Sequence, residues 1–209
     1  MSRDNKRTAL AIVAVTMLAL PAARASAATS TAMTVKGNEA TASFSVNESI
    51  ACGTTTATRT TFVSVQMFET RPVGKAAPAP ATQTVVVVSR FETCTFTGSF
   101  DIGFFNTFTL QMTALSRATL AGHFVLEGGT VVDANLALTG VAPVQQGTFM
   151  QRSNLGKVMV SQHSVGSQSA ATIAGTVSLD GHALPTSQML SPEGFLANST
   201  GGEVIVIRP

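Results

Sequence analysis

Residues that could bind a metal are few in this chain, which has three histidines, two cysteines and no tryptophan or tyrosine. A zinc or copper site needs three or four ligands converging at about 2.0–2.3 Å. None of the histidines, His123, His163 and His182, has a second histidine or a cysteine at a ligand-like spacing. We therefore expect exposed histidines, no metal site and no cofactor.

Acid–base chemistry would have to come from scattered carboxylates. The candidates for a glycosidase pair are Glu69, Glu92, Asp101, Glu127, Asp133 and Asp180. Sugar sites usually stack a ring on an aromatic that has a polar handle, and every aromatic here is phenylalanine. Neither Gly-x-Ser-x-Gly nor Ser-x-x-Lys occurs after residue 27.

A hydrolase whose site assembles only in three dimensions stays open. We would recognise it by a pocket that joins two or more of Glu92, Asp101, Asp133, His123 and His163. The catalytic residues themselves are unknown from the sequence.

Cys52 and Cys94 are predicted to form a disulfide, because an even pair of cysteines in an oxidising compartment is normally oxidised. On the chain-entropy argument, closing a loop of this length stabilises the fold by roughly 4 kcal/mol.

The oxidising compartment follows from residues 1–27, which have the order of a secretory signal peptide. Arg3, Lys6 and Arg7 precede an apolar run over 8–20, and residues 25–27 (Ala-Ser-Ala) suit cleavage before Ala28. The run is shorter than the roughly 20 residues that span a bilayer. We expect a secreted protein, periplasmic or extracellular, with no integral membrane span after cleavage.

The basic character of the chain belongs to this segment. Of 13 basic and 11 acidic residues, residues 1–27 hold Arg3, Lys6, Arg7, Arg24 and Asp4, which leaves 9 and 10 and a net charge of −1. The remaining basic residues are scattered singly, whereas binding to nucleic acid needs clustered Lys and Arg. Nucleic acid is therefore excluded as a partner.

The elements that must position any site are strands. Apolar and polar residues alternate over 40–47, 62–68, 94–104, 107–113, 119–127, 132–139 and 171–180, and 204–207 is apolar. Turns are expected at Gly128-Gly129 and Asp180-Gly181, a doubly buried strand at 85–88 and an exposed proline-rich loop at 71–81. This pattern predicts one all-β domain over 28–209, an antiparallel sandwich of about nine or ten strands, with a closed barrel as the alternative.

Six of the twelve phenylalanines lie between Phe91 and Phe108. Phe96, Phe100 and Phe104 share one parity, which predicts that they face the core. Phe105 has the opposite parity, which predicts a bulge or a surface contact. A Phe-lined barrel that carries a small apolar ligand is the alternative.

We therefore expect a secreted, non-enzymatic β-sandwich that acts as a surface, matrix or binding module, with a hydrolase and an apolar-ligand carrier as alternatives. A cell-surface partner fits the first of these. Asn47 and Asn198 match the N-glycosylation acceptor pattern. Two matches are also expected by chance in a chain this rich in serine and threonine.

Overall fold

The computed structural model describes residues 29–74, 79–155, 158–184 and 189–207, so the predicted signal peptide lies outside the described residues. Within them the chain is strand and turn. The strands are β1 (Thr29–Cys52), β2 (Thr55–Val73), β3 (Ala81–Glu92), β4 (Thr97–Phe105), β5 (Gln111–Thr113), β6 (Arg117–Val125), β7 (Val131–Leu155), β8 (Val158–Leu179), β9 (His182–Ala183) and β10 (Met189–Ile207).

The ten strands form one antiparallel sheet in the order β4-β3-β2-β1-β10-β8-β7-β6-β5, with β9 paired to β8. The sheet curves back on itself, so that the N–H of Glu127, after β6, donates to the carbonyl of Ile102 on β4 at 3.0 Å. The order still has two ends, β4 and β5, and the sheet does not close. The prediction of an antiparallel sandwich of nine or ten strands is therefore confirmed, and the alternative of a closed barrel is not.

The core lies between the two halves of this folded sheet and follows the predicted alternation. Its largest fully buried side chains include Phe44, Phe124, Met67, Leu120, Leu136, Leu138 and Leu196. On β3, Val86 and Val88 are buried while Val85 and Val87 are only half-buried. The expectation that this strand is buried on both faces is therefore wrong for its outer face.

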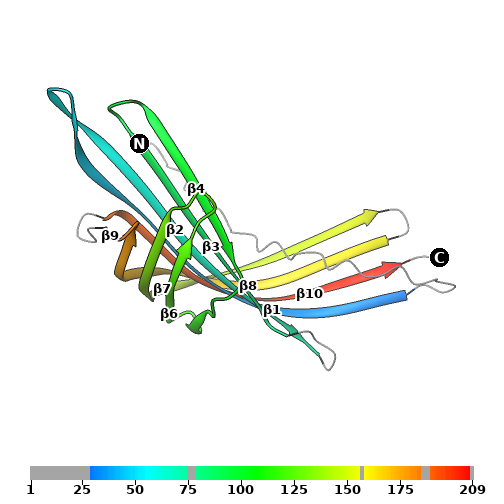
Figure 1. Ribbon diagram of the computed structural model, residues 1–209. Helices are drawn as coiled ribbons and strands as arrows, with labels where there is room; N and C mark the ends of the chain where they lie inside the picture. Colours follow the sequence, from blue (N-terminus) through cyan, green and yellow to red (C-terminus); the bar gives the residue numbers. More distant parts are fainter. Residues whose placement is uncertain (1–28, 75–78, 156–157, 185–188, 208–209) are drawn as a thin grey trace, which may run out of the picture.

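Two parts of the sheet reach beyond the core (Figure 1). At the right of the view, β1, β10, β8 and β7 continue side by side, with Thr34, Gly202, His163 and Met150 in register across them. At the upper left, the β1–β2 and β3–β4 hairpins extend past the other strands.

The predicted turns are confirmed. Gly128 and Gly129 join β6 to β7, and Asp180 and Gly181 join β8 to β9 with positive φ angles of 52° and 80°. The proline-rich loop begins later than predicted, because β2 continues to Val73; residues 75–78 lie outside the described residues.

The predicted facing of the phenylalanines is wrong. Phe96, Phe100 and Phe104 are 79%, 67% and 55% exposed. Phe105, which we expected at the surface, instead packs at ring-centroid distances of 5.2 Å from Phe124 and 6.0 Å from Phe108.

The register of β4 gives the physical reason. Gly103 pairs with the buried Val86, so the odd-numbered residues of β4 face inward. A Cβ at Gly103 would stand 2.7 Å from the Phe105 ring and 2.9 Å from Leu126, so these side chains occupy the space that a larger residue would fill. Apart from Phe105, the inward positions of β4 carry small or polar residues, and Phe100 and Phe104 point out. Phe96 lies in the turn before this strand.

Candidate binding cleft and adjoining hairpin tip

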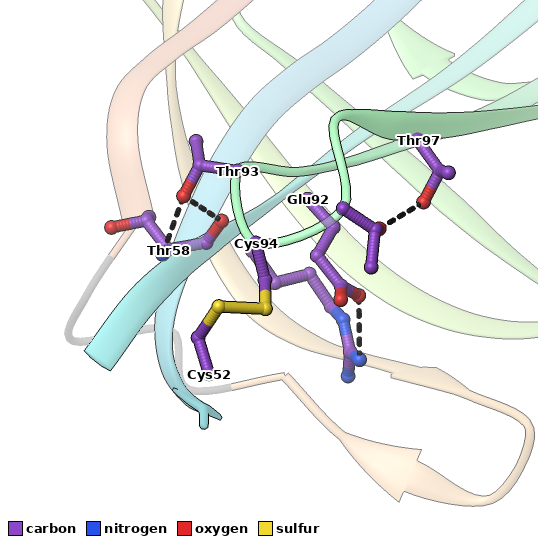
Figure 2. A network of polar contacts seen from close by, with 8 residues as sticks. Cys52, Thr58, Glu92, Thr93, Cys94 and Thr97 are labelled. Carbon is purple, nitrogen blue, oxygen red and sulfur yellow. Dashed lines mark hydrogen bonds and ion pairs between the residues drawn. A yellow bond between two sulfur atoms is a disulfide. The ribbon is translucent and has the colours of Figure 1, made fainter. Parts of the chain in front are cut away.

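The predicted disulfide is present and joins the turns of two hairpins. Cys52 ends β1, Cys94 lies in the turn between β3 and β4, and their sulfurs are 2.01 Å apart (Figure 2). Beside them, the Thr93 N–H donates to the Thr58 carbonyl at 2.9 Å, and the Thr58 N–H donates to Thr93 Oγ1 at 2.9 Å. The two hairpin ends are therefore held as one unit.

A cleft of about 580 Å³ opens beside these hairpin ends. Residues from the ends of β1, β2, β3 and β4 line one wall, and the β8–β9 turn lines the other. The lining residues are Glu48, Arg59, Thr61, Arg90, Phe91, Glu92, Thr97, Gly98, Ser99, Leu179, Asp180, His182, Ala183 and Leu184. Its volume lies within the range of ordinary small-molecule sites.

Two ion pairs organise the charges of the cleft. Arg59 Nη2 lies 3.1 Å from Glu92 Oε2, between facing residues of β2 and β3 (Figure 2). Arg90 Nη2 lies 2.9 Å from Asp180 Oδ2 and connects the two walls. Each arginine is therefore neutralised by a carboxylate.

Asp180 is fixed by more than its arginine. Its Oδ1 accepts the Val131 N–H at 2.9 Å, and its own N–H donates to the Val131 carbonyl at 2.8 Å. The Val131 N–H, and after it the Arg90 guanidinium, hold the pKa of this carboxyl below its ordinary value. Asp180 is consequently ionised at neutral pH, and its role is to hold the turn.

Glu48 differs from the other carboxylates of the cleft. It has no hydrogen-bond or ion-pair partner among the described residues. Phe91 is 45% exposed, but it pairs with Thr60, so its side chain lies on the face of the sheet opposite to Glu92. The charged lining residues are two arginines and three carboxylates, so the cleft offers one unpaired carboxylate.

Of the five residues named for a hydrolase, the structure brings two together, but on open surface. His123 Nδ1 lies 2.6 Å from Asp133 Oδ1, with side chains 65% and 50% exposed. Ser178 Oγ donates to Asp133 Oδ2 at 3.4 Å. The carboxylate stands between the other two groups, whereas a nucleophilic triad needs the histidine in contact with the serine.

The remaining predicted carboxylates and histidine have other positions. Asp101 accepts the N–H groups of Gly128 at 2.7 Å and Thr130 at 3.1 Å, which fastens the β6–β7 turn to β4. Desolvation acts to raise the pKa of Asp101, but these hydrogen bonds together hold it below its ordinary value. Glu127 and His163 are exposed, on the β6–β7 turn and on β8.

Glu69 is buried on β2, where its Oε1 accepts from Arg71 Nη2 at 2.6 Å and its Oε2 accepts from Asn38 Nδ2 at 3.2 Å. Both glycosylation candidates lie within strands: Asn47 is exposed on β1 and accepts a hydrogen bond from Thr60, and Asn198 is half-buried on β10. None of these residues lines the cleft.

Glu39 on β1 is a buried acid that sequence reasoning missed, and it is only 3% exposed. Burial raises the pKa of this carboxyl to about 7, against the opposing effect of a hydrogen bond from Thr41 Oγ1 at 3.3 Å. It sits within an otherwise regular strand, where only its charge distinguishes it from its neighbours.

Sequence reasoning also did not identify Glu48, Arg59, Arg90 and Phe91 as residues that line a cleft. A detectable signal existed for one pair: once β2 and β3 are aligned as a hairpin, Arg59 faces Glu92. The approach of Asp180 to Arg90 depends on how the sheet folds over, which no local pattern contains.

No family model and no curated protein matches this chain. Among solved structures, it is similar to a protein from Nitrosomonas europaea provisionally described as AttH, with 9% sequence identity and a TM-score of 0.30. The match covers 84% of this chain and 52% of the other, so the chain spans about half the length of that protein.

The described residues contain no apolar helix of membrane-spanning length. In the same part of the chain, no group of three His, Cys, Asp or Glu residues is placed to hold a metal ion.

Proposed function

We propose that this chain is an extracytoplasmic, non-enzymatic binding module that holds a small organic cation in the cleft. The observation that carries the proposal is the unpaired Glu48 in a cleft whose two arginines are both paired with other carboxylates. An unpaired carboxylate recognises an ammonium group because it supplies the opposite charge and accepts charge-assisted N–H hydrogen bonds.

The paired arginines support a cation over an anion. Arg59 and Arg90 already have carboxylate partners at 3.1 and 2.9 Å, so an incoming anion would have to displace Glu92 or Asp180. A cation at Glu48 would displace no ion pair, since Arg59, which faces Glu48 across β1 and β2, is paired with Glu92. The hydroxyls of Thr61, Thr97 and Ser99 also line the cleft and supply neutral acceptors for N–H groups.

The two alternative functions have less support. A hydrolase would use the His123–Asp133 pair, which lies on exposed surface and outside the cleft lining. An apolar-ligand carrier would need a Phe-lined cavity, and Phe91 is the single phenylalanine among these lining residues. The Cys52–Cys94 disulfide is compatible with the extracytoplasmic location.

The proposal is tested by titrating the protein with tetramethylammonium, choline and ethylammonium, and with acetate and glucose as other chemical classes, followed by NMR or calorimetry. We expect at least one ammonium compound to bind and the two other classes not to bind. Glu48→Gln should weaken that binding by about tenfold, the value of one partly exposed charge-assisted contact.

The matched control is Glu127→Gln, which removes an exposed carboxylate outside the cleft lining. It should leave ammonium binding unchanged. Equal affinity in the Glu48→Gln variant and the unmodified protein, or binding of acetate alone, would contradict the proposal.

A further inference from the structure

We infer that the linked ends of the β1–β2 and β3–β4 hairpins are a contact surface for the interface of a lipid bilayer. We call this surface the hairpin tip and define it as residues 49–58 and 93–100. It shares Thr97, Gly98 and Ser99 with the cleft lining but does not depend on the cation proposed there.

The hairpin tip combines exposed aromatic rings with an absence of charge. Phe96 and Phe100 are 79% and 67% exposed, although phenylalanine is normally buried. No Lys, Arg, Asp or Glu occurs over 49–58 or 93–100. Entry into the headgroup region would therefore desolvate no ionised side chain.

Charged residues mark where the tip ends. Glu48 and Arg59 flank the first segment, and Glu92 and Asp101 flank the second. Arg59 and Glu92 form an ion pair at 3.1 Å at this boundary (Figure 2). These charges would stay in water or at the headgroups while the tip enters, which limits the depth of insertion.

The backbone of the tip already satisfies several of its own hydrogen bonds. Thr58 and Thr93 exchange backbone and hydroxyl contacts of 2.9 to 3.1 Å across the two hairpins. Cys52 and Cys94 join the same two ends covalently. A segment that pairs its polar groups internally loses less on leaving water, so this tip can enter an interface as a preformed unit.

The shape favours a lipid surface over a protein partner or a second copy. The two hairpins reach past the rest of the sheet, so the tip is a projection and not a flat face (Figure 1). A stable protein interface needs about 800 Å² of complementary surface on each partner. A bilayer interface accommodates a projecting apolar group without a matching pocket. Because the tip has no basic residue, we expect it to bind zwitterionic lipid with little dependence on salt.

The absence of tryptophan allows a direct test. Phe96→Trp places a single fluorophore at the tip, and Met150→Trp places one at a residue that is 76% exposed on β7, in the opposite extension of the sheet. With phosphatidylcholine vesicles, we expect a blue shift of emission for Phe96→Trp and no shift for Met150→Trp. Raising the salt concentration should not reverse the shift.

A flotation assay with the same vesicles measures binding itself. Phe96→Ser together with Phe100→Ser should lower the vesicle partition coefficient by about tenfold or more, since two apolar rings no longer leave water. Met150→Ser should leave it unchanged. The inference is overturned if Phe96→Trp shows no shift, if salt abolishes flotation, or if sedimentation shows a dimer that the Phe96→Ser and Phe100→Ser changes dissociate. Cation binding in the cleft, measured separately, would not be affected by these outcomes.

Discussion

Arg90 on β3 and Asp180 in the β8–β9 turn lie ninety positions apart in sequence, yet Nη2 and Oδ2 are 2.9 Å apart. This ion pair connects the two walls of the cleft. The other oxygen of Asp180 accepts the N–H of Val131, so one carboxylate fixes the turn to β7 and to β3 at once.

Replacing this carboxylate should loosen the turn more than it destabilises the fold. The two side chains are 34% and 45% exposed, so the ion pair contributes about 1 kcal/mol or less. We expect Asp180→Asn to lower the free energy of unfolding by that amount. We also expect faster hydrogen exchange at the Leu184 N–H, which donates to the Val177 carbonyl beyond the turn.

A double-mutant cycle with Arg90→Gln checks the cause. The two single variants should together lose more unfolding free energy than the double variant loses, because removing either partner already breaks the pair. Strictly additive losses would show that the two residues act independently.

The disulfide predicts a second effect on stability. Replacing Cys52 and Cys94 together by serine releases a loop with a sequence separation of 42. The chain-entropy argument gives a loss of about 4 kcal/mol, measured by denaturant unfolding. A loss well below 1 kcal/mol would mean that the disulfide does not restrict the unfolded chain as this argument requires.

A third prediction concerns the two faces of β4. Phe105 packs against Phe124 and Phe108, whereas Phe100 is 67% exposed. Phe105→Ala should therefore lower the free energy of unfolding by about 3 kcal/mol. Phe100→Ala, on the same strand, should change it by about 0.5 kcal/mol or less. A larger loss for Phe100→Ala than for Phe105→Ala would mean that Phe100 faces the core, as the sequence pattern predicts.

This strand also shows where the sequence pattern stops being informative. Alternation located the strands of the core, because residues such as Ala40, Ala42 and Phe44 face a second layer along their whole length. β4 is an edge strand, and the hairpin it forms with β3 reaches past that layer. There Phe100 and Phe104 face water. Gly103 faces inward, and the Phe105 ring fills the space beside it.

The cleft was less accessible to sequence reasoning than the fold. Its walls come from segments near residues 48, 60, 91, 98 and 181, and alternation says nothing about which hairpins meet. Cross-strand pairing could have connected Arg59 to Glu92. The second wall depends on the curvature of the whole sheet. The disulfide was predictable because it needs only two cysteines and a compartment.

The last prediction follows from Glu39, whose pKa burial raises from 4.5 to about 7. Because the folded protein holds this proton more tightly than the unfolded chain, its contribution to stability is fully present below pH 4.5 and is lost as pH rises to about 7. The loss is on the order of 3 kcal/mol. Glu39→Gln should therefore stabilise the protein above pH 7 and flatten the decline of unfolding free energy across this window.

Denaturant titrations at several pH values measure both effects, with Glu127→Gln as the exposed control. Parallel pH profiles for Glu39→Gln and the unmodified protein would show that this carboxyl is ionised in the folded chain, and that water or a neighbouring cation reaches it.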